Sequence, residues 1–91
     1  MDFEWSHEKH ERNLRERGFG FDVAASIFAG PVVEAAEDFS EYGEVRVQAI
    51  GQTPEGRTLF VVYTDTDEDV RRIISARKAD KQEVRIWLAN L

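Results

Sequence analysis

Two consecutive β-type segments joined by an acidic connection constrain the fold of this chain more than any other part of its sequence. The first, Leu59 to Tyr63, combines β-branched, aromatic and aliphatic residues, which is typical of a central strand covered on both faces. Asp65 to Asp69 follows, and its residues are too acidic to be buried and favour a turn. Val70 to Lys78 then returns as a second strand. Together these segments predict a β-hairpin at the centre of an antiparallel sheet.

The second strand of this hairpin is loaded with cations, although it must also bury isoleucine. Side chains alternate along a regular strand, so Ser75 and Arg77 are expected to face one side of the sheet. Arg72 and Lys78 are expected to face the other side. These four side chains therefore cannot meet at one phosphate group unless a β-bulge breaks the alternation. This strand is therefore the first candidate for a functional surface.

Helix and strand signals continue on the N-terminal side of the hairpin. The expected elements there are a short strand at Phe3–Trp5, helices at His7–Arg17 and Val23–Ala29, and strands at Val32–Glu37 and Glu44–Gly51. The short connections between strands favour antiparallel pairing. We therefore expect residues 1–91 to form a single α+β domain. Its antiparallel sheet has four main strands, to which the N-terminal strand can add a fifth, with two N-terminal helices and one C-terminal helix.

The chain is expected to close with an amphipathic helix. Asp80 and Glu83 stand at the spacing of a capping box, in which each side chain accepts a hydrogen bond from the backbone of the other residue. The apolar residues that follow recur at i, i+3, i+4 and i+7: Val84, Trp87, Leu88 and Leu91. This spacing predicts that they form one buried stripe.

The 91 residues carry a net charge of −6, which is the wrong sign for a non-specific nucleic-acid-binding protein. The charge is uneven, however, because cations gather near the C-terminus. The sequence has no cysteine, no apolar run approaching the roughly 20 residues that span a bilayer, and no signal segment at its start. We therefore expect a cytoplasmic protein without disulfides and without membrane contact.

Several blocks of residues occur in the order and at the spacing of a known family. They are Phe3-Glu4-Trp5, Lys9, Asn13, Arg17-Gly18, Phe21 and Ala24-Ala25, then Arg46 with Ile50-Gly51, then Arg72 to Ala79 with Glu83. In these blocks the chain resembles the BrnT family, the toxin half of a bacterial type II toxin–antitoxin pair, over nearly its whole length. The resemblance implies a small RelE-like ribonuclease fold that a BrnA-like antitoxin neutralises. It also implies that DNA is reached only through the antitoxin, which carries the DNA-binding domain in this family.

RNA cleavage without a metal ion needs a base for the 2′-hydroxyl, an acid for the departing 5′-oxygen and cations for the charge on the phosphorane. Guanidinium groups suit the last task, so we place Arg77 first and Arg46 second among the catalytic candidates. Ser75, Lys9 and His7 complete these candidates, the last two as proton carriers. The residues expected to bind RNA are Arg72, Lys78 and Arg12.

A structural role competes with each of these assignments. The arginines also suit ion pairs that bridge the sheet to the last helix through Glu83 or Asp80, and His7 and Lys9 also suit a solvated helix surface. For the whole protein, the alternative to a ribonuclease is a non-catalytic module that binds the antitoxin and takes part in autoregulation of its operon. A RelE-shaped domain with a different ligand is a third option.

No cofactor or metal ion is expected. His7 and His10 are three residues apart but have no third ligand nearby. The acidic connection opens at Asp65 like a calcium-binding loop, yet Val70 stands where that loop needs glycine and Ala76 stands where it needs glutamate. Both patterns therefore fail as metal sites.

Overall fold

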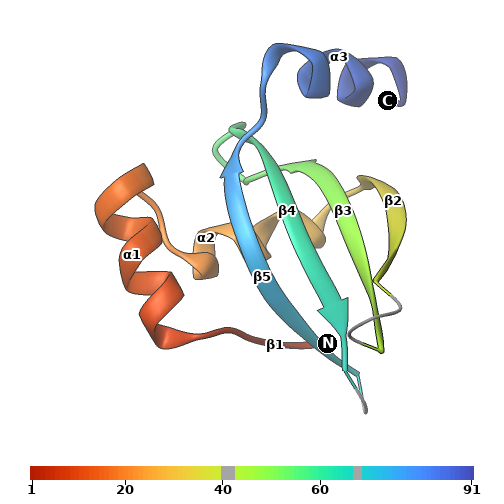
Figure 1. Ribbon diagram of the computed structural model, residues 1–91. Helices are drawn as coiled ribbons and strands as arrows, with labels where there is room; N and C mark the ends of the chain where they lie inside the picture. The colour runs from red at the N-terminus through yellow and green to blue at the C-terminus, as the bar shows by residue number, and fades with distance from the viewer. Residues whose placement is uncertain (40–42, 67–68) are drawn as a thin grey trace.

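The computed structural model describes residues 1–39, 43–66 and 69–91, and over this part the chain forms one five-stranded sheet with helices packed around it (Figure 1). The strands are β1 (Asp2–Glu4), β2 (Val32–Phe39), β3 (Glu44–Gln52), β4 (Thr58–Asp65) and β5 (Val70–Lys78). The helices are α1 (His7–Arg17), α2 (Phe21–Ala25), the 3₁₀-helix η1 (Ser26–Ala29) and α3 (Lys81–Ala89). In the described ranges, no helix combines the length and the apolar character needed to cross a membrane. The α+β class predicted from the sequence is confirmed.

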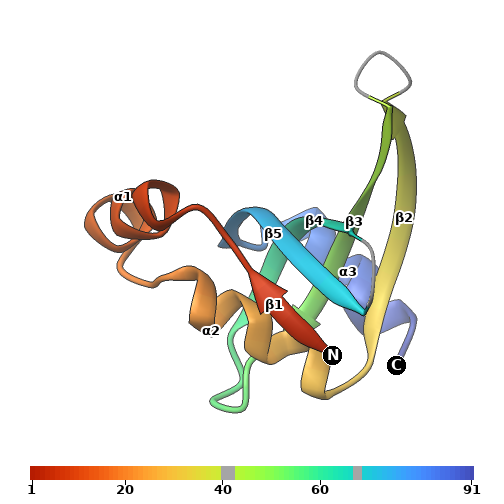
Figure 2. The same cartoon turned by 90° about the horizontal axis from the view of Figure 1, so that it is seen from below.

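The sheet has the strand order β1-β5-β4-β3-β2 and is mixed rather than purely antiparallel. Strands β2 to β5 form the predicted antiparallel meander, with β4 and β5 paired as a hairpin. The N-terminal strand does add a fifth strand, but it pairs in parallel with the start of β5, from Asp2–Val70 to Glu4–Arg72 (Figure 2). Parallel pairing is allowed because a long stretch of chain separates β1 from β5. The middle of the predicted acidic connection, at positions 67 and 68, lies outside the described residues.

The core lies on the face of the sheet that α2 and η1 cover. Alternate residues of β4, from Leu59 to Tyr63, are buried there against Phe21 and Ile27. On the opposite face, which we call the open face, Val62 is only half-buried. The expectation that β4 is covered on both faces is therefore wrong. The physical reason is that α3 packs mainly on β2 and β3 and no helix crosses the rest of the open face (Figure 2).

A β-bulge in β5 breaks the regular alternation of its side chains. Ser75 pairs with Val62 of β4, but Ile73 pairs with Tyr63, so the pairing skips Ile74. The extra residue lets Ile73 and the buried side chains beyond the bulge point to the same core face.

The bulge also changes which polar side chains of β5 lie together. Arg72, Ser75 and Arg77 all lie on the open face, because each pairs with a β4 residue of that face. Lys78 pairs with Leu59 and lies on the core face. The expected grouping of Arg72 with Lys78, opposite Ser75 and Arg77, is therefore wrong for Arg72.

The first helix has the predicted bounds. The Ser6 hydroxyl accepts a hydrogen bond of 3.3 Å from the backbone N–H of Lys9, as an N-cap does. Gly18 ends the helix in the left-handed region, at φ +81°, where glycine is favoured. Both signals are local, which is why the sequence predicts this helix correctly.

The second helix differs from its prediction at both ends. It starts at Phe21 instead of Val23, because the Nδ1 atom of His10 in α1 accepts the Phe21 N–H at 2.9 Å and satisfies the first turn. After Ala25 it tightens into η1, so the predicted single helix from Val23 to Ala29 is wrong. A contact from another element, rather than a local cap, sets this boundary.

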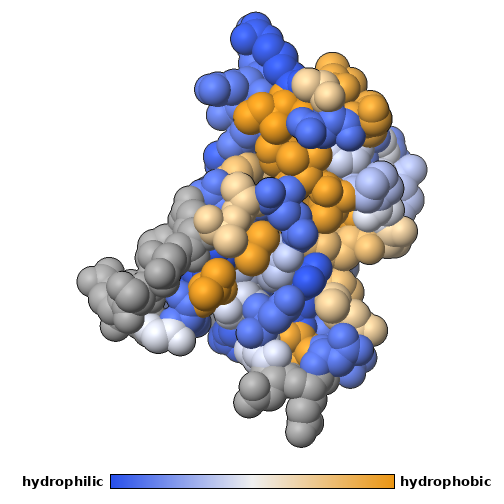
Figure 3. All heavy atoms as spheres, turned by 90° about the vertical axis from the view of Figure 1, so that its right-hand side faces the viewer, coloured by the Kyte–Doolittle hydropathy of each residue, from blue (hydrophilic) through white to orange (hydrophobic). Residues whose placement is uncertain are grey.

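The last helix begins with the predicted capping box, in which Asp80 accepts from the Glu83 N–H at 2.8 Å and Glu83 accepts from the Asp80 N–H at 2.9 Å. Trp87 is buried, but Leu88 is 59% exposed and Leu91 is 76% exposed. The predicted buried stripe is therefore wrong for both leucines, since α3 touches the sheet through a narrow face and Leu91 lies beyond the helix end. Figure 3 shows extensive apolar surface on the side of the molecule formed by β2 and α3.

Candidate functional site

A hollow of about 420 Å³ lies between α1 and the open face of the sheet, and we call it the α1 hollow. It forms because α1 sits beside the edge of β5 rather than across the sheet (Figure 1). The polar and charged residues that line it are Lys9, Arg12, Asn13, Glu16 and Arg17 of α1, Arg46 of β3 and Ser75 of β5. Val62 and Ile74 contribute apolar surface to its lining. The hollow therefore gathers four predicted site residues: Lys9, Arg12, Arg46 and Ser75.

Helical spacing explains why one helix supplies most of this lining. Lys9, Asn13 and Arg17 follow one another at i, i+4 and i+8, so they lie along one face of α1. Arg46 reaches the same hollow because it alternates with core-facing Val47 along β3 and so points to the open face.

The α1 hollow is locally basic although the chain is acidic. Its charged lining, among the described residues, consists of Lys9, Arg12, Arg17 and Arg46 against the carboxylate of Glu16. The Arg12 Nη2 atom pairs with Glu8 at 3.1 Å, and the Arg46 Nε atom pairs with Glu44 at 2.8 Å. The pair of Arg12 with Glu8 is exposed, and exposed pairs contribute only about 0–1 kcal/mol, so a phosphate group can compete with Glu8 for Arg12. The Lys9 ammonium makes no hydrogen bond or ion pair with any residue that the structure describes.

Arg17 is held in place by a buried asparagine. The Nη1 atom of Arg17 donates to the Asn13 Oδ1 atom at 3.0 Å and to the Ala76 carbonyl of β5 at 3.2 Å. Asn13 is 5% exposed, and its Nδ2 atom donates to the Phe19 carbonyl at 2.9 Å. Sequence reasoning gave neither residue a role of its own. The available signal was the i, i+4 spacing of asparagine and arginine on one helix face.

Arg77 lies outside the lining of the α1 hollow. Its Nη1 and Nη2 atoms each donate to the Glu83 carboxylate at 2.8 Å, and its Cζ atom lies 4.3 Å from the centroid of the Phe60 ring. These hydrogen bonds raise the pKa of Arg77 and lower the pKa of Glu83. The geometry is that of the competing structural role, in which an arginine of the sheet braces the last helix.

The other predicted residues also lie away from this lining. Arg72 pairs with Glu4 of β1 at 3.0 Å. Lys78 lies on the core face and borders a different hollow. His7 has a largely exposed side chain 3.5 Å from Glu11, one turn further along α1.

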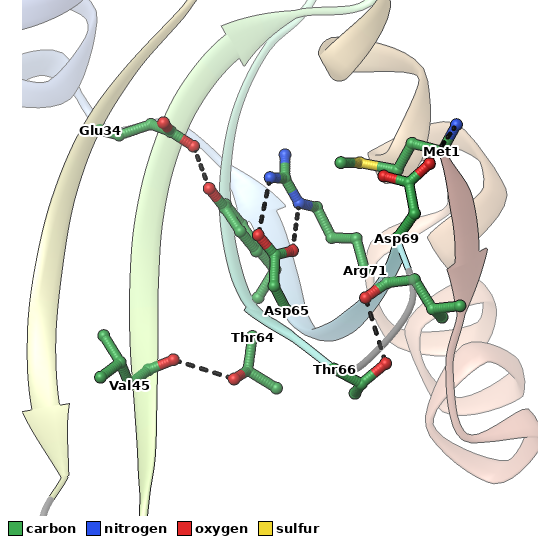
Figure 4. A network of polar contacts seen from close by, with 10 residues as sticks. Met1, Glu34, Val45, Thr64, Asp65, Thr66, Asp69 and Arg71 are labelled. Carbon is green, nitrogen blue, oxygen red and sulfur yellow. Dashed lines mark hydrogen bonds and ion pairs between the residues drawn. The ribbon is translucent and has the colours of Figure 1, made fainter.

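A second polar cluster, which the sequence reasoning did not identify, links β2, β4 and β5 (Figure 4). The Arg71 Nε and Nη2 atoms donate to the two carboxylate oxygens of Asp65 at 2.7 and 3.1 Å, and the Arg71 Cζ atom lies 3.9 Å from the Tyr63 ring centroid. The Tyr63 hydroxyl donates to Glu34. Burial and this hydrogen bond raise the pKa of Tyr63, so the phenol stays protonated near neutral pH and does not act as a base. Every polar group of the cluster has a partner, which indicates a structural role.

Within residues 1–39, 43–66 and 69–91, no three His, Asp or Glu side chains are arranged to hold a metal ion. His10 accepts the Phe21 N–H through Nδ1 and stacks on Trp5, so it serves the fold.

Comparison with known proteins connects this geometry to one family. The family model described as "Ribonuclease toxin, BrnT, of type II toxin-antitoxin system" matches residues 5–83. Among solved structures, the chain is similar to the 1.1 Å crystal structure of the Brucella abortus ribonuclease toxin BrnT, with a TM-score of 0.64 and 20% identity. The match covers 89% of this chain and 99% of the Brucella chain, and at this identity it shows a shared fold. No curated protein matches the chain.

Proposed function

Because the chain belongs to the family of BrnT ribonuclease toxins of type II toxin–antitoxin systems, we propose that it is an endoribonuclease that cleaves RNA in the α1 hollow without a metal ion. One observation carries the proposal: Lys9, Arg17 and Arg46 converge on one hollow of an otherwise acidic protein. Converging cations of this kind suit a substrate whose backbone carries a negative charge at every nucleotide.

The proposed reaction transfers the phosphoryl group to the neighbouring 2′-hydroxyl. The 2′-oxygen bonds to phosphorus, the bond from phosphorus to the 5′-oxygen breaks, and the products end in a 2′,3′-cyclic phosphate and a 5′-hydroxyl. Glu16 accepts the proton of the 2′-hydroxyl, and the Lys9 ammonium donates a proton to the leaving 5′-oxygen. Arg46 and Arg17 donate hydrogen bonds to the phosphorane oxygens, where the negative charge develops. Ser75 donates a further hydrogen bond from β5.

This role is tested by cleavage of RNA by the purified protein, freed of any antitoxin, in the presence of a chelator. Arg46→Ala should lower the cleavage rate by about 100-fold or more, the usual cost of losing one donor to a developing oxyanion. Arg15→Ala is the matched control, because Arg15 is an exposed cation of α1 that does not line the hollow. Wild-type rates in both variants would contradict the assignment.

We further propose a BrnA-like antitoxin as the partner, with both proteins in the cytoplasm and DNA contacted only by the antitoxin. Membership of a type II toxin family implies an antitoxin. The surface best suited to it is at the end of the chain, where Ile86 and Leu88 of α3 and Leu91 just beyond the helix are exposed beside the apolar side formed by β2 and α3 (Figure 3). Neighbouring exposed apolar side chains are typical of a protein-binding site.

The second candidate function is a non-catalytic module that binds the antitoxin and takes part in autoregulation of the operon. It is favoured by the ion pairs that already engage Arg46 and Arg77, and by the net charge of −6. Protein that binds its antitoxin but leaves RNA intact, and whose expression alone does not arrest growth, would favour this candidate over the ribonuclease.

A further inference from the structure

A second hollow of about 390 Å³ adjoins the α1 hollow at the end of α1. Its lining comes from the segment after α1, the β3–β4 turn, the end of β5 and α3. Phe19, Leu59 and Val84 supply its apolar walls. Arg57 and Lys78 are the exposed cations that line this hollow alone, whereas Arg17, also exposed, lines both hollows. We call this the turn hollow.

Arg57 and Lys78 both stand on hydrogen-bonded backbone. In the β3–β4 turn, the Arg57 N–H donates to the Thr53 hydroxyl at 3.1 Å, and the Thr53 N–H donates to the Arg57 carbonyl at 2.9 Å. Lys78 ends β5, and the next residue's N–H donates to the Thr58 carbonyl at 3.0 Å. Their attachment points are therefore fixed relative to the sheet, while neither cation forms an ion pair with a described residue.

Arg17 marks the divide between the two hollows. Ser75, in the α1 hollow, lies on the open face of β5, whereas Lys78, in the turn hollow, lies on its core face. Arg17 bonds to the Ala76 carbonyl at the β5 edge between them. Beyond Arg72 this edge has no strand partner among the described elements. Cations thus follow one path from Lys9 past Arg17 to the turn hollow.

We propose that the turn hollow binds the nucleotide next to the scissile phosphate, so that single-stranded RNA crosses the β5 edge at Arg17. The inference rests on the proposed function. Apolar walls suit the faces of a ribose and base, and the hollow has the size of a small-molecule site, about 300–1,000 Å³. Arg57 and Lys78 contact the phosphate of that nucleotide, as in other grooves that track a single strand.

The test is the salt dependence of RNA binding, measured by fluorescence anisotropy with a labelled single strand whose 2′-hydroxyls are all methylated and which cannot be cleaved. Each phosphate contact to a single strand contributes about 0.7 to the slope of log affinity against log salt. Because both cations contact one phosphate, the double variant Arg57→Gln with Lys78→Gln should lower the slope by about 0.7. Counted from 1 M down to 0.1 M salt, this equals a loss of about 5-fold in affinity at 0.1 M.

Matched controls separate contact from net charge. Arg15→Gln with Arg85→Gln removes two exposed cations that line neither hollow and should leave the slope close to that of the wild type. Arg57→Lys keeps the charge and should keep the slope. Thermal unfolding of each variant checks that the fold is retained.

The outcomes distinguish this inference from the function on which it rests. Equal slope changes in the turn-hollow double variant and in the control double variant would overturn the subsite proposal. In that case, cleavage of unmodified RNA by the wild type would still support the ribonuclease function. Binding without cleavage, with the slope change confined to the turn-hollow variant, would support the subsite and refute the ribonuclease. A loss of antitoxin affinity in place of RNA affinity would make the turn hollow a protein contact and overturn the inference.

Discussion

Replacing Arg77 by alanine should weaken the fold without removing RNA cleavage. The guanidinium donates two hydrogen bonds of 2.8 Å to Glu83 and lies over the Phe60 ring. A hydrogen bond to a charged group contributes about 1.5–3 kcal/mol, but the Arg77 side chain is 41% exposed, so solvent screening reduces the gain. We therefore expect the free energy of unfolding to fall by about 2 kcal/mol, near the lower end of the range for a hydrogen bond to a charged group.

The measurement is thermal and urea unfolding of Arg77→Ala beside the wild type. A loss of about 2 kcal/mol corresponds to roughly 8–16 °C in a domain of this size. The pKa of Glu83 is lowered in the fold, so the pair stabilises above the ordinary carboxylate pKa of about 4.3. That stabilisation is lost as the pH falls through the lowered value. The difference between the two proteins should therefore shrink in acid.

Cleavage is then measured at a temperature at which both proteins are folded, and the variant should cut RNA at close to the wild-type rate. Arg72→Ala serves as the control for removal of a cation from the same strand, since its pair with Glu4 is more exposed. If Arg77→Ala cut about 100-fold more slowly with an unchanged free energy of unfolding, Arg77 would belong to the chemistry and this reasoning would be refuted.

Three further predictions follow from the described contacts. Asn13→Ala should lower the free energy of unfolding, measured in urea, by about 1–3 kcal/mol, because it leaves the Phe19 carbonyl unpaired. It should also slow RNA cleavage in a cleavage assay, because it removes a hydrogen bond that holds Arg17. Tyr63→Phe should cost about 1 kcal/mol through the lost bond to Glu34 and leave the pH dependence of cleavage unchanged; a shifted profile would mean that the phenol titrates in the reaction. Leu88→Asp should leave the melting temperature unchanged, since this side chain is exposed, and should reduce antitoxin affinity measured by calorimetry; unchanged affinity would place the antitoxin elsewhere.

Elements specified by neighbouring residues could be predicted from the sequence. Ser6 and Gly18 delimit α1 by capping chemistry, and the capping box at Asp80 starts α3. The hairpin of β4 and β5 follows from composition and turn signals. The caps depend on contacts a few residues apart, which a sequence displays directly, and the hairpin depends on two consecutive segments and the turn between them.

Features set by packing between distant elements could not be predicted. The bulge at Ile74 arises from the register with β4, and it moves Arg72 to the open face. The start of α2 depends on His10 of another helix. The sequence named Glu83 as a possible ion-pair partner of Arg77. Whether Arg77 forms that pair instead of facing the hollow depends on the position of Glu83 in the folded chain.

For the same reason, the sequence names candidate residues of the α1 hollow but does not show that they lie together. The sequence named Lys9, Arg12, Arg46 and Ser75 separately, but only the packing of α1 beside β5 brings them to one hollow. Arg17 was overlooked because α1 mixes acidic and basic residues around its whole surface. Its place in the hollow is set by its bonds to Asn13 and to the β5 backbone.

The most direct test of the central claim, that the α1 hollow holds the scissile phosphate, is an NMR titration of backbone amides with an RNA dinucleotide whose 2′-hydroxyls are methylated. We predict that the largest chemical-shift changes occur at Lys9, Asn13, Arg46 and Ser75, and that they saturate together. Changes centred instead on Glu83 and the start of α3, with the α1 hollow unmoved, would contradict the claim.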